Sequence, residues 1–459
     1  MKAYRVNTYV QMILLCLSLW GMFIPYQTSF ADEDTASSFP QTKLQLLPQK
    51  ISPYSKVRVK IFPHDRDYKP HGLDKNKTQI SFVSNELCHV FEGQRQRPAK
   101  AKKAMFASRE VTVDLKMVAS HPLWIECGKP VTLIREAHLP HFTYPGSFYV
   151  HKVVRGDDKY LEVVNVVALR DYVKGVVPTE VYPGWPMETL KTQAVAARTY
   201  AIFHYVYSHR YARSRYWDVD DTIAFQAYTG NSLRTPRTDQ AVIDTEGQIL
   251  MHGREVIQAY YHADSAGKTE SAWNVWKSNI PYVGPIQEFF HEEQEPTQWS
   301  KEISLKNLNK RLRSARVLTK KEEIINLSVP VIGRTESGRV RLVTLILKNG
   351  EFKNVSVPVI RRAVGSLPST LFTFEADEKS QDKLWIRGQG NGHGVGMSQK
   401  GASYLAGSKN WTYDRILDFY YLDTTLCRLG KSQGSIPDCY QHSRDLAAEQ
   451  LSAKKRNAS

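Results

Sequence analysis

The sequence predicts an α+β protein, in which a small β-rich module near the N-terminus precedes a larger mixed domain with one long helix. Two observations support this fold class. Short runs that alternate apolar and polar residues, such as KVRVKIF and VTVDLKMV, recur over residues 53–138 and are typical of strands. After Pro186, by contrast, small apolar residues recur at three- and four-residue steps, as on one face of a helix. With 42% hydrophobic residues among 459, the chain can bury a sizeable core.

The first 31 residues have the layout of a secretory signal peptide. Lys2 and Arg5 precede an apolar run over residues 10–24, and small residues near Ala31 fit a cleavage site after it. The apolar run is short for a complete bilayer span, so an uncleaved membrane anchor is the weaker alternative. We therefore expect an exported protein, periplasmic or secreted, that is not an integral membrane protein after cleavage.

Composition divides the rest of the chain into four parts. Residues 32–52 are polar, with few periodic apolar positions, and are predicted as a linker. Residues 53–138 form the β-rich module, whose charge run QRQRPAKAKKA is typical of a solvated loop. Residues 139–428 are assigned to the mixed domain, and residues 429–459 to a polar basic tail.

Four cysteines remain once a signal peptide containing Cys16 is removed. In an exported chain they indicate disulfides, for which three connectivities exist. Closeness in sequence favours the pairs Cys88–Cys127 and Cys427–Cys439. A zinc site is the competing interpretation, but it lacks the closely spaced Cys-x-x-Cys pairs that would support it.

The chain is strongly basic, with a formal net charge of +16. Such a surface favours polyanionic partners. Nucleic acid is a poor candidate because the protein is expected to be exported and carries no recognisable nucleic-acid-binding motif. Anionic polymers outside the cell fit better, although charge that only keeps the protein soluble is an equal alternative.

The mixed domain is predicted to open with paired strands, SFYVHKVV and YLEVVNVVAL, followed by RDYVKGVVPTEV. Glu180 then lies where a strand gives way to a turn, a place from which its carboxylate can face a cleft. A dipole interaction with the next helix is the alternative role. That helix begins at Pro186, with Glu188 in its first turn. Its small-residue stripe comprises Leu190, Ala194, Ala197 and Ala201.

A polar loop, Ser265–Thr269 in YYHADSAGKTESAWNVW, is flanked by Trp273 and Trp276. The segment DSAGKT lacks the glycine spacing and the strand–loop–helix order of a phosphate-binding loop. Aromatic rings beside hydrogen-bonding groups suit a sugar, whose C–H faces are apolar and whose hydroxyls need partners. Packing of both tryptophans in a core is the alternative.

A glycine-rich segment, RGQGNGHGVGMSQKGASYLA, surrounds His393. Glycine at alternate positions allows a backbone to approach another backbone or a ligand closely. The spacing is not that of a dinucleotide-binding fingerprint. No second histidine or cysteine stands at ligand spacing from His393, so a metal site is not indicated.

Together these segments resemble the SpoIID/LytB family of bacterial cell-wall proteins. The matching stretches occur in the family's order over residues 139–427 and are YVKGVVPTEVYPGWPMETLKTQAVAARTYA, TIAFQAYTG, DSAGKTESAWNVW, PYVGPI, SGRV and GQGNGHGVGMSQKGA. The resemblance implies a SpoIID-like fold and a lytic transglycosylase. Such an enzyme cleaves the MurNAc–GlcNAc bond of peptidoglycan strands whose peptides have been removed, and it leaves 1,6-anhydroMurNAc ends.

Two other functions stay open. LytB-like members are glycan-binding enhancers of an N-acetylmuramoyl-L-alanine amidase, which would then be a protein partner. A purely structural wall-binding protein would explain the basic charge but not the retained acid. All three interpretations place the exported protein in the periplasm or at the cell wall, with peptidoglycan glycan strands as its partner.

The resemblance also assigns site residues. Glu180 corresponds to the family's catalytic acid. The substrate-binding residues that it implies are Arg198, Gln226, Tyr228, Ser265, Gly267, Thr269, His393, Ser398 and Gln399. Some members bind zinc through a His–Cys pair beside the Gln-x-Tyr segment, but Ala224 and Phe225 stand there in this chain. We therefore expect no zinc and no other cofactor.

A single carboxylate suits this chemistry. Most glycosidases use two, of which one activates water or acts as nucleophile. In a lytic transglycosylase the C6 hydroxyl of the muramic acid itself attacks the anomeric carbon. One acid therefore protonates the leaving oxygen and then accepts the proton of that hydroxyl. This role requires Glu180 to be protonated at the working pH, and therefore a raised pKa.

Overall fold

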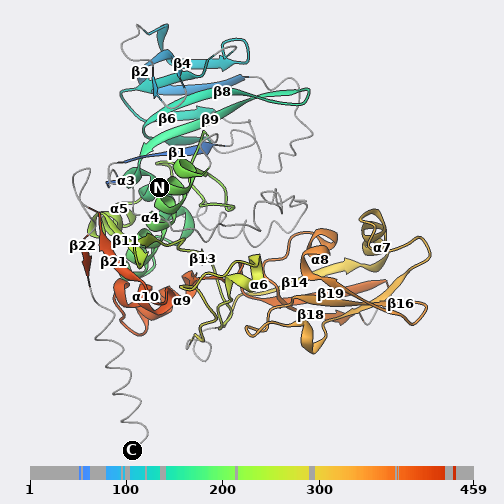
Figure 1. The fold of residues 1–459 in the computed structure, drawn as a ribbon. Coiled ribbons are helices and arrows are strands. Elements are labelled where there is room, and N and C mark those ends of the chain that lie inside the picture. The colour runs from blue at the N-terminus through green and yellow to red at the C-terminus, as the bar shows by residue number, and fades with distance from the viewer. Residues whose placement is uncertain are drawn as a thin grey trace, which may run out of the picture. The chain divides into compact units, whose positions relative to one another are not determined.

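The computed structural model describes residues 51–52, 55–61, 79–94, 97–98, 104–118, 121–134, 141–211, 216–288, 295–377, 380, 382–429 and 438–440. The predicted signal peptide, most of the predicted linker and most of the predicted tail lie outside the described residues. The chain forms two compact units. The sheet–helix unit comprises Gln41–Tyr261, Pro281–Gly284 and Gly396–Ser459, and the inserted unit comprises His262–Ile280 and Pro285–Val395. Figure 1 shows their elements.

A large sheet of ten strands forms one layer of the sheet–helix unit. Eight of its strands run in the order β10-β1-β9-β8-β5-β2-β6-β7, and β3 and β4 each pair with β2. Their bounds are β1 (Lys56–Ile61), β2 (Gln79–Gln94), β3 (Arg97–Pro98), β4 (Phe106–Asp114), β5 (Leu123–Cys127), β6 (Val131–Ile134), β7 (Phe142–Tyr144), β8 (Ser147–Arg155), β9 (Asp158–Ala168) and β10 (Val219–Asp220).

This sheet crosses the boundary predicted between the N-terminal module and the mixed domain. Strand β5, from the predicted module, pairs antiparallel with β8, and β1 pairs antiparallel with β9 along its full length. The two segments therefore share one sheet and one hydrophobic core. Local sequence patterns identify strands but not their distant partners, which is why the pairing was not predicted.

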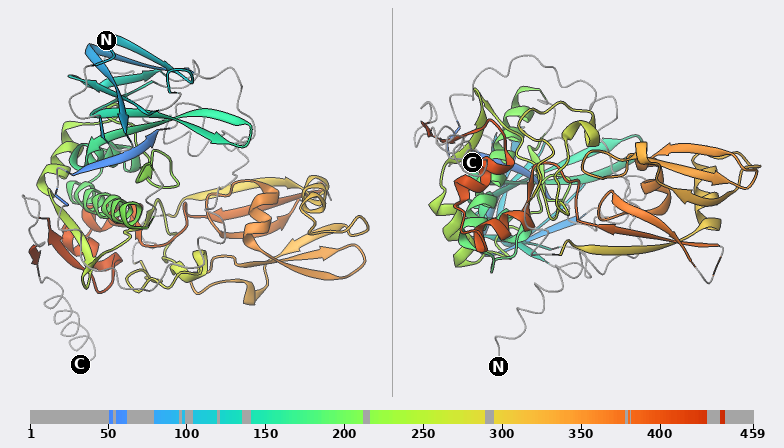
Figure 2. Two further views of the ribbon diagram at one scale, coloured as in Figure 1. Left: turned by 45° about the horizontal axis from the view of Figure 1, so that its top comes forward. Right: turned by 90° about the horizontal axis from the view of Figure 1, so that it is seen from below.

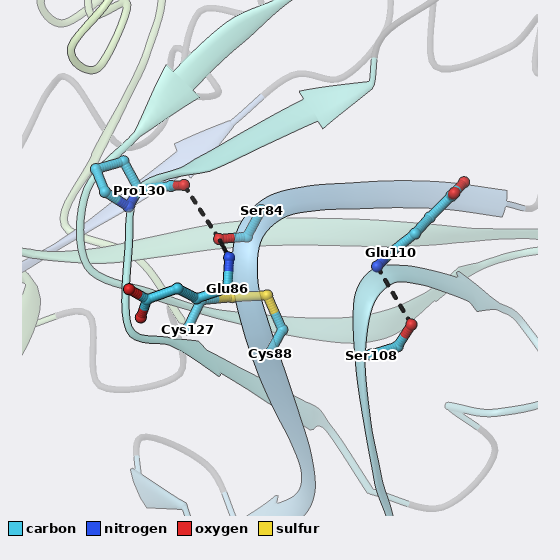
Figure 3. The surroundings of a disulfide bond; sticks show 7 residues. All are labelled: Ser84, Glu86, Cys88, Ser108, Glu110, Cys127 and Pro130. Carbon is cyan, nitrogen blue, oxygen red and sulfur yellow. Dashed lines mark hydrogen bonds between the residues drawn. A yellow bond between two sulfur atoms is a disulfide. The ribbon is translucent and has the colours of Figure 1, made fainter.

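The predicted disulfide between Cys88 and Cys127 is confirmed. The two residues stand opposite each other in the pairing of β2 with β5, as Figure 3 shows. Cys427, on β21 (Thr425–Arg428), is also disulfide-bonded, and its register partner on β22 (Asp438–Tyr440) is Cys439. The side chain of Cys439 lies outside the described residues, so that pairing stays a prediction.

Helices pack against the end of the sheet that contains β10, β1 and β9 (Figures 1 and 2). They are α3 (Leu169–Glu180), α4 (Met187–Arg210) and α5 (Pro236–Asp244), with α9 (Gln399–Gly407) and α10 (Tyr413–Tyr420) on α4. The unit also contains β11 (Gln248–His252) and β12 (Glu255–Val256). The chain passes between the units within β13 (Tyr261–His262), on each side of Pro281–Gly284, and just before β20 (Met397–Ser398).

The long helix is present as predicted, but it begins at Met187, one residue later than expected, and Pro186 is its N-terminal cap residue. Its predicted small-residue stripe is fully buried in the core, where it allows close packing. The prediction for the preceding segment is wrong, because residues 169–180 form helix α3 and not a strand and turn. Its valines and Pro178 disfavour a helix locally. Burial of Val173, Val176 and Val177 in the core outweighs that preference.

The inserted unit has its own hydrophobic core. One three-stranded sheet has the order β14-β19-β18 and another β15-β16-β17. The bounds are α6 (Ala272–Trp276), β14 (Gln298–Ser304), α7 (Leu305–Ser314), β15 (Ile324–Ser328), η2 (Val331–Gly333), β16 (Leu342–Leu347), β17 (Phe352–Ser356), α8 (Val357–Val364), β18 (Leu371–Ala376) and β19 (Lys383–Gln389). The mixed α+β class is therefore confirmed. No helix in the described ranges combines the length and apolar character that a membrane span needs.

Candidate active site

Glu180 is the last residue of helix α3, and the chain turns to an extended conformation at Val181. Its side chain is half-buried. Its Oε1 atom accepts a hydrogen bond from the backbone N–H of Ala227 at 2.7 Å. The C-terminal end of a helix carries partial negative charge, which disfavours the carboxylate form, whereas the N–H donor favours it. The carboxyl group is therefore held in one orientation by the segment TIAFQAYTG.

A polar network lies beside Glu180 in the same unit. The Tyr172 hydroxyl donates to Oε1 of Gln226 at 3.1 Å, and Nε2 of Gln226 donates to the Tyr261 hydroxyl at 3.0 Å and to the carbonyl of Ala197 at 3.3 Å. Burial raises the pKa of Tyr261 well above its usual value, and the nearby Glu180 carboxylate raises it further. The Tyr261 hydroxyl therefore stays protonated at neutral pH.

Tyr228 lies beneath this network and is almost fully buried. Its hydroxyl donates to Oδ1 of Asn165 at 3.1 Å, and its ring packs on that of Tyr172 with centroids 5.0 Å apart. A Cβ atom on Gly175 would lie 2.5 Å from the Tyr228 ring. The close packing of α3 on this segment brings the Ala227 N–H to Glu180.

Arg198 is buried on α4, with only 2% of its surface exposed. Its guanidinium donates to the carbonyls of Gln248 at 3.1 Å and Val242 at 3.2 Å, and to the hydroxyl of Thr245 at 3.4 Å. Burial lowers its pKa to about 10. These contacts join α4 to the C-terminal end of α5 and to β11. Arg198 therefore stabilises the packing of these elements.

Ser398 and Gln399 stand at the start of α9 and are both buried. The Ser398 hydroxyl caps the helix by accepting from the N–H of Gly401 at 3.2 Å. Nε2 of Gln399 donates to Oε1 of Gln193 on α4 at 3.3 Å. Ser398 therefore stabilises the first turn of α9, and Gln399 connects α9 to α4.

The serine-glycine loop belongs to the inserted unit. The Ser265 hydroxyl donates to the carboxylate of Glu288 and accepts from the N–H of Gly267 at 3.0 Å. Thr269 exchanges two hydrogen bonds with Ile286: its N–H donates to the Ile286 carbonyl at 3.0 Å, and its hydroxyl accepts at 2.7 Å. The loop is therefore held rigidly against residues 286–288.

The glycine-rich segment packs tightly against the rest of the inserted unit. Gly392 and Gly394 both have positive φ, and added Cβ atoms would lie 2.7 Å from His262 and 2.5 Å from Arg339. Nδ1 of His393 accepts from the N–H of Val395 at 3.0 Å, and its ring lies 5.0 Å from that of Trp276. The predicted close approach at these glycines is thus a packing requirement.

The structure divides the predicted site residues between the two units. Glu180 and Gln226 come together in the sheet–helix unit, whereas Ser265, Thr269 and His393 belong to the inserted unit. Sequence reasoning missed Tyr172, Tyr261, Glu288 and Arg339, the last of which donates to the Ser265 carbonyl at 2.8 Å. Arg339 lies in the matching segment SGRV, and Tyr261 lies three residues before Asp264, the first residue of DSAGKTESAWNVW, but no local signal links them to their partners.

The residues at the family's zinc position do not fit a metal. Ala224 offers no ligand, and the Phe225 ring packs edge-on against those of His204 and Trp217. Within the described ranges, no three His, Cys, Asp or Glu side chains lie close enough together to hold an ion. The expectation that the protein lacks zinc stays a prediction.

Comparison with known proteins locates two families along the chain. Residues 157–252 match the family model described as stage II sporulation protein, and residues 259–396 match a domain of unknown function. The second range nearly coincides with the inserted unit.

Curated relatives cover a little over half of the chain. It is 35% identical to an uncharacterized protein of Brachyspira hyodysenteriae (56% of this chain, 66% of that protein) and 31% identical to an amidase enhancer of Bacillus subtilis (55% and 40%). It is 30% identical to stage II sporulation protein D of Bacillus amyloliquefaciens (56% and 74%). The chain thus spans just under two thirds of the first relative and less than half of the second. Its similarity over most of the length of stage II sporulation protein D shows that the chain belongs to that family.

Proposed function

We propose that the protein is a peptidoglycan lytic transglycosylase that uses Glu180 as its single general acid and base. The observation that supports this best is the hydrogen bond from the Ala227 N–H to Glu180, because it fixes the orientation of the carboxyl group. The substrate is the glycan strand from which the peptides have been removed. The products carry 1,6-anhydroMurNAc ends, and the protein acts in the periplasm or at the cell wall.

The reaction needs two proton transfers and no cofactor. Protonated Glu180 donates its proton to the glycosidic oxygen as the bond to the anomeric carbon breaks. The C6 hydroxyl of the same muramic acid then forms the new bond to that carbon, and its proton passes to the Glu180 carboxylate. Both transfers return the enzyme to its starting state. The partial negative charge at the end of α3 favours the protonated form that the first transfer requires, whereas the Ala227 N–H favours the carboxylate that accepts the second proton.

The other predicted residues take two kinds of role in this proposal. His393 is half-buried and stays a candidate for substrate contact. Ser265, Gly267 and Thr269 are enclosed by protein, and we infer that they hold the loop in shape. The remaining enclosed residues are inferred to position other elements: Arg198, Tyr228, Ser398 and Gln399. Gln226, which is also buried, positions the Tyr261 hydroxyl and the segment that carries the Ala227 N–H.

The alternative function is that of a glycan-binding enhancer of an N-acetylmuramoyl-L-alanine amidase. It is favoured by the 31% identity to a protein named amidase enhancer. In that case the glycan would be bound but not cleaved, and the amidase would be the partner. The retained Glu180, in its hydrogen-bonded position, favours the enzyme.

Product analysis separates the two functions. Purified mature protein is incubated with peptide-free glycan strands, and the ends are examined by mass spectrometry. New anhydromuramyl ends that depend on Glu180 support the transglycosylase. Intact strands, together with faster peptide release when an amidase is added, would support the enhancer.

A further inference from the structure

Trp273, on helix α6 of the inserted unit, exposes 55% of its surface. A single exposed apolar side chain is common in folded proteins and needs no explanation by itself. An indole presented from a rigid element is different, because it offers a flat apolar face that is already ordered before a ligand arrives. The question is therefore how firmly α6 is held.

The buried carboxylate of Glu270 holds the start of α6 in place. One of its oxygens accepts from the N–H of Ser271 at 2.7 Å and from Nδ2 of Asn274 at 2.8 Å. The other accepts from the hydroxyls of Thr335 at 2.5 Å and Ser337 at 2.7 Å. Glu270 exposes only 1% of its surface, and four hydrogen bonds to its carboxylate make this a firm anchor.

A second anchor lies at the other end of α6. The Trp276 ring packs edge-on against His393, with centroids 5.0 Å apart. The helix is thus fixed between Glu270 and the glycine-rich segment, and Trp273 projects from the fixed part. The exposed indole is preorganised.

A cation lies over one face of this indole. Lys277 caps α6 in the left-handed conformation, with φ of 58°. Its ammonium nitrogen lies 5.5 Å from the centroid of the Trp273 ring. Among the described residues, no carboxylate lies within ion-pair distance of Lys277. Trp273 therefore offers an apolar face next to the Lys277 ammonium group, which has no acidic partner among the described residues.

We propose that Trp273 and Lys277 form a glycan-binding platform that recognises muramic acid whose carboxylate is free. The indole face opposite Lys277 stacks on the apolar C–H face of a pyranose ring, and the ammonium group pairs with the lactyl carboxylate. In peptide-bearing strands that carboxylate is tied up in an amide, and it becomes a charged group only when the peptide is removed. The platform thus gives a chemical reason for a preference for peptide-free strands. It rests on the proposed function for its substrate class and assigns glycan binding to the inserted unit.

Binding is measured in the full mature chain carrying Glu180→Gln, so that the strands are not cut during the experiment. The two probes are purified peptide-free glycan strands and strands that retain their peptides. We expect Trp273→Ala to weaken binding of both probes about tenfold, and Trp273→Phe to weaken it less because a smaller aromatic face remains. Lys277→Gln should weaken binding of the peptide-free probe alone, by about threefold, and Lys277→Arg should restore it.

Phe352→Ala is the matched control, because Phe352 is an aromatic residue of the same unit with 72% of its surface exposed. It should leave both affinities unchanged. Unchanged binding by Trp273→Ala would overturn the platform, as would an equal loss in Phe352→Ala. Equal effects of Lys277→Gln on both probes would overturn the recognition of the carboxylate. Cleavage is assayed separately with an intact Glu180, so failure of the proposed enzyme activity is distinguishable from failure of the platform.

Discussion

The carboxyl oxygen of Glu180 and the backbone nitrogen of Ala227 are 2.7 Å apart, although the two residues are 47 positions apart in sequence. This hydrogen bond joins the end of α3 to the segment TIAFQAYTG. It also explains why two of the matching segments belong together, since one carries the acid and the other orients it.

Glu180→Gln should abolish glycan cleavage while leaving binding intact. The amide keeps the size of the side chain and can still accept from Ala227, but it cannot transfer the proton. Loss of general acid–base catalysis costs about two to four orders of magnitude in rate. In the proposed mechanism one group serves both transfers, so we expect the upper end, measured as anhydromuramyl ends formed per unit time.

The control for that variant is Glu110→Gln, in the same unit on β4, because Glu110 is exposed. Glu188 is unsuitable, since its carboxylate accepts from the N–H of Tyr413 at 2.8 Å and from Lys191 at 2.9 Å. Cleavage by Glu180→Gln at the wild-type rate would remove Glu180 from the mechanism. Loss of binding together with cleavage would indicate a structural role.

Arg198→Met should destabilise the fold and leave glycan affinity of the folded protein unchanged. The substitution leaves the carbonyls of Gln248 and Val242 without their buried donor, and each such group costs about 1–3 kcal/mol. We expect a loss of about 2–6 kcal/mol in the free energy of unfolding, measured in urea. Wild-type stability combined with weakened glycan binding would instead make Arg198 a substrate contact.

Gly394→Ala should destabilise the inserted unit more than Gly350→Ala does. Both glycines have φ near +85°, so the backbone strain of an alanine is matched. At Gly394 the new Cβ would lie 2.5 Å from the buried Arg339 guanidinium, whereas at Gly350 nothing lies within 4 Å. We expect the clash to add about 1–3 kcal/mol at Gly394. An equal loss of unfolding free energy in both variants would show that Arg339 moves aside without destabilising the unit.

Cys427 and Cys439 should form a disulfide, because they are register partners on β21 and β22 and Cys427 is oxidised. Closing so short a loop stabilises the fold by about 3 kcal/mol through the unfolded chain. Peptide mapping of unreduced protein should recover the two cysteines in one linked pair. Alkylation of either thiol in unreduced, denatured protein would contradict the assignment.

The purified protein should contain no stoichiometric zinc. Neither Ala224 nor Phe225 can supply the nitrogen or sulfur ligands that zinc prefers. Elemental analysis of protein purified without added metal gives the measurement. One equivalent of zinc that survives dialysis against a weak chelator would refute the prediction.

Local patterns in the sequence were sufficient for several features. The small-residue stripe of α4 is a helical period, and the need for glycine at Gly392 and Gly394 follows from steric limits on the backbone. The helical period and the glycine requirement depend on neighbouring residues, which is why they can be recognised without a structure. The pair Cys88–Cys127 is 39 residues apart, and it was favoured because only four cysteines are expected in the exported chain and these two are close in sequence.

Other features depend on residues that are distant in sequence. The single sheet across the predicted domain boundary arises from strand pairing, and α3 is helical because its valines are buried in a core that other segments complete. The burial of Arg198 against α5 and β11, and the bond from Ala227 to Glu180, likewise join separate segments. The local sequence shows which polar groups and strands need partners. It does not show which partners they find, because the free energies of burial and strand pairing depend on the whole fold.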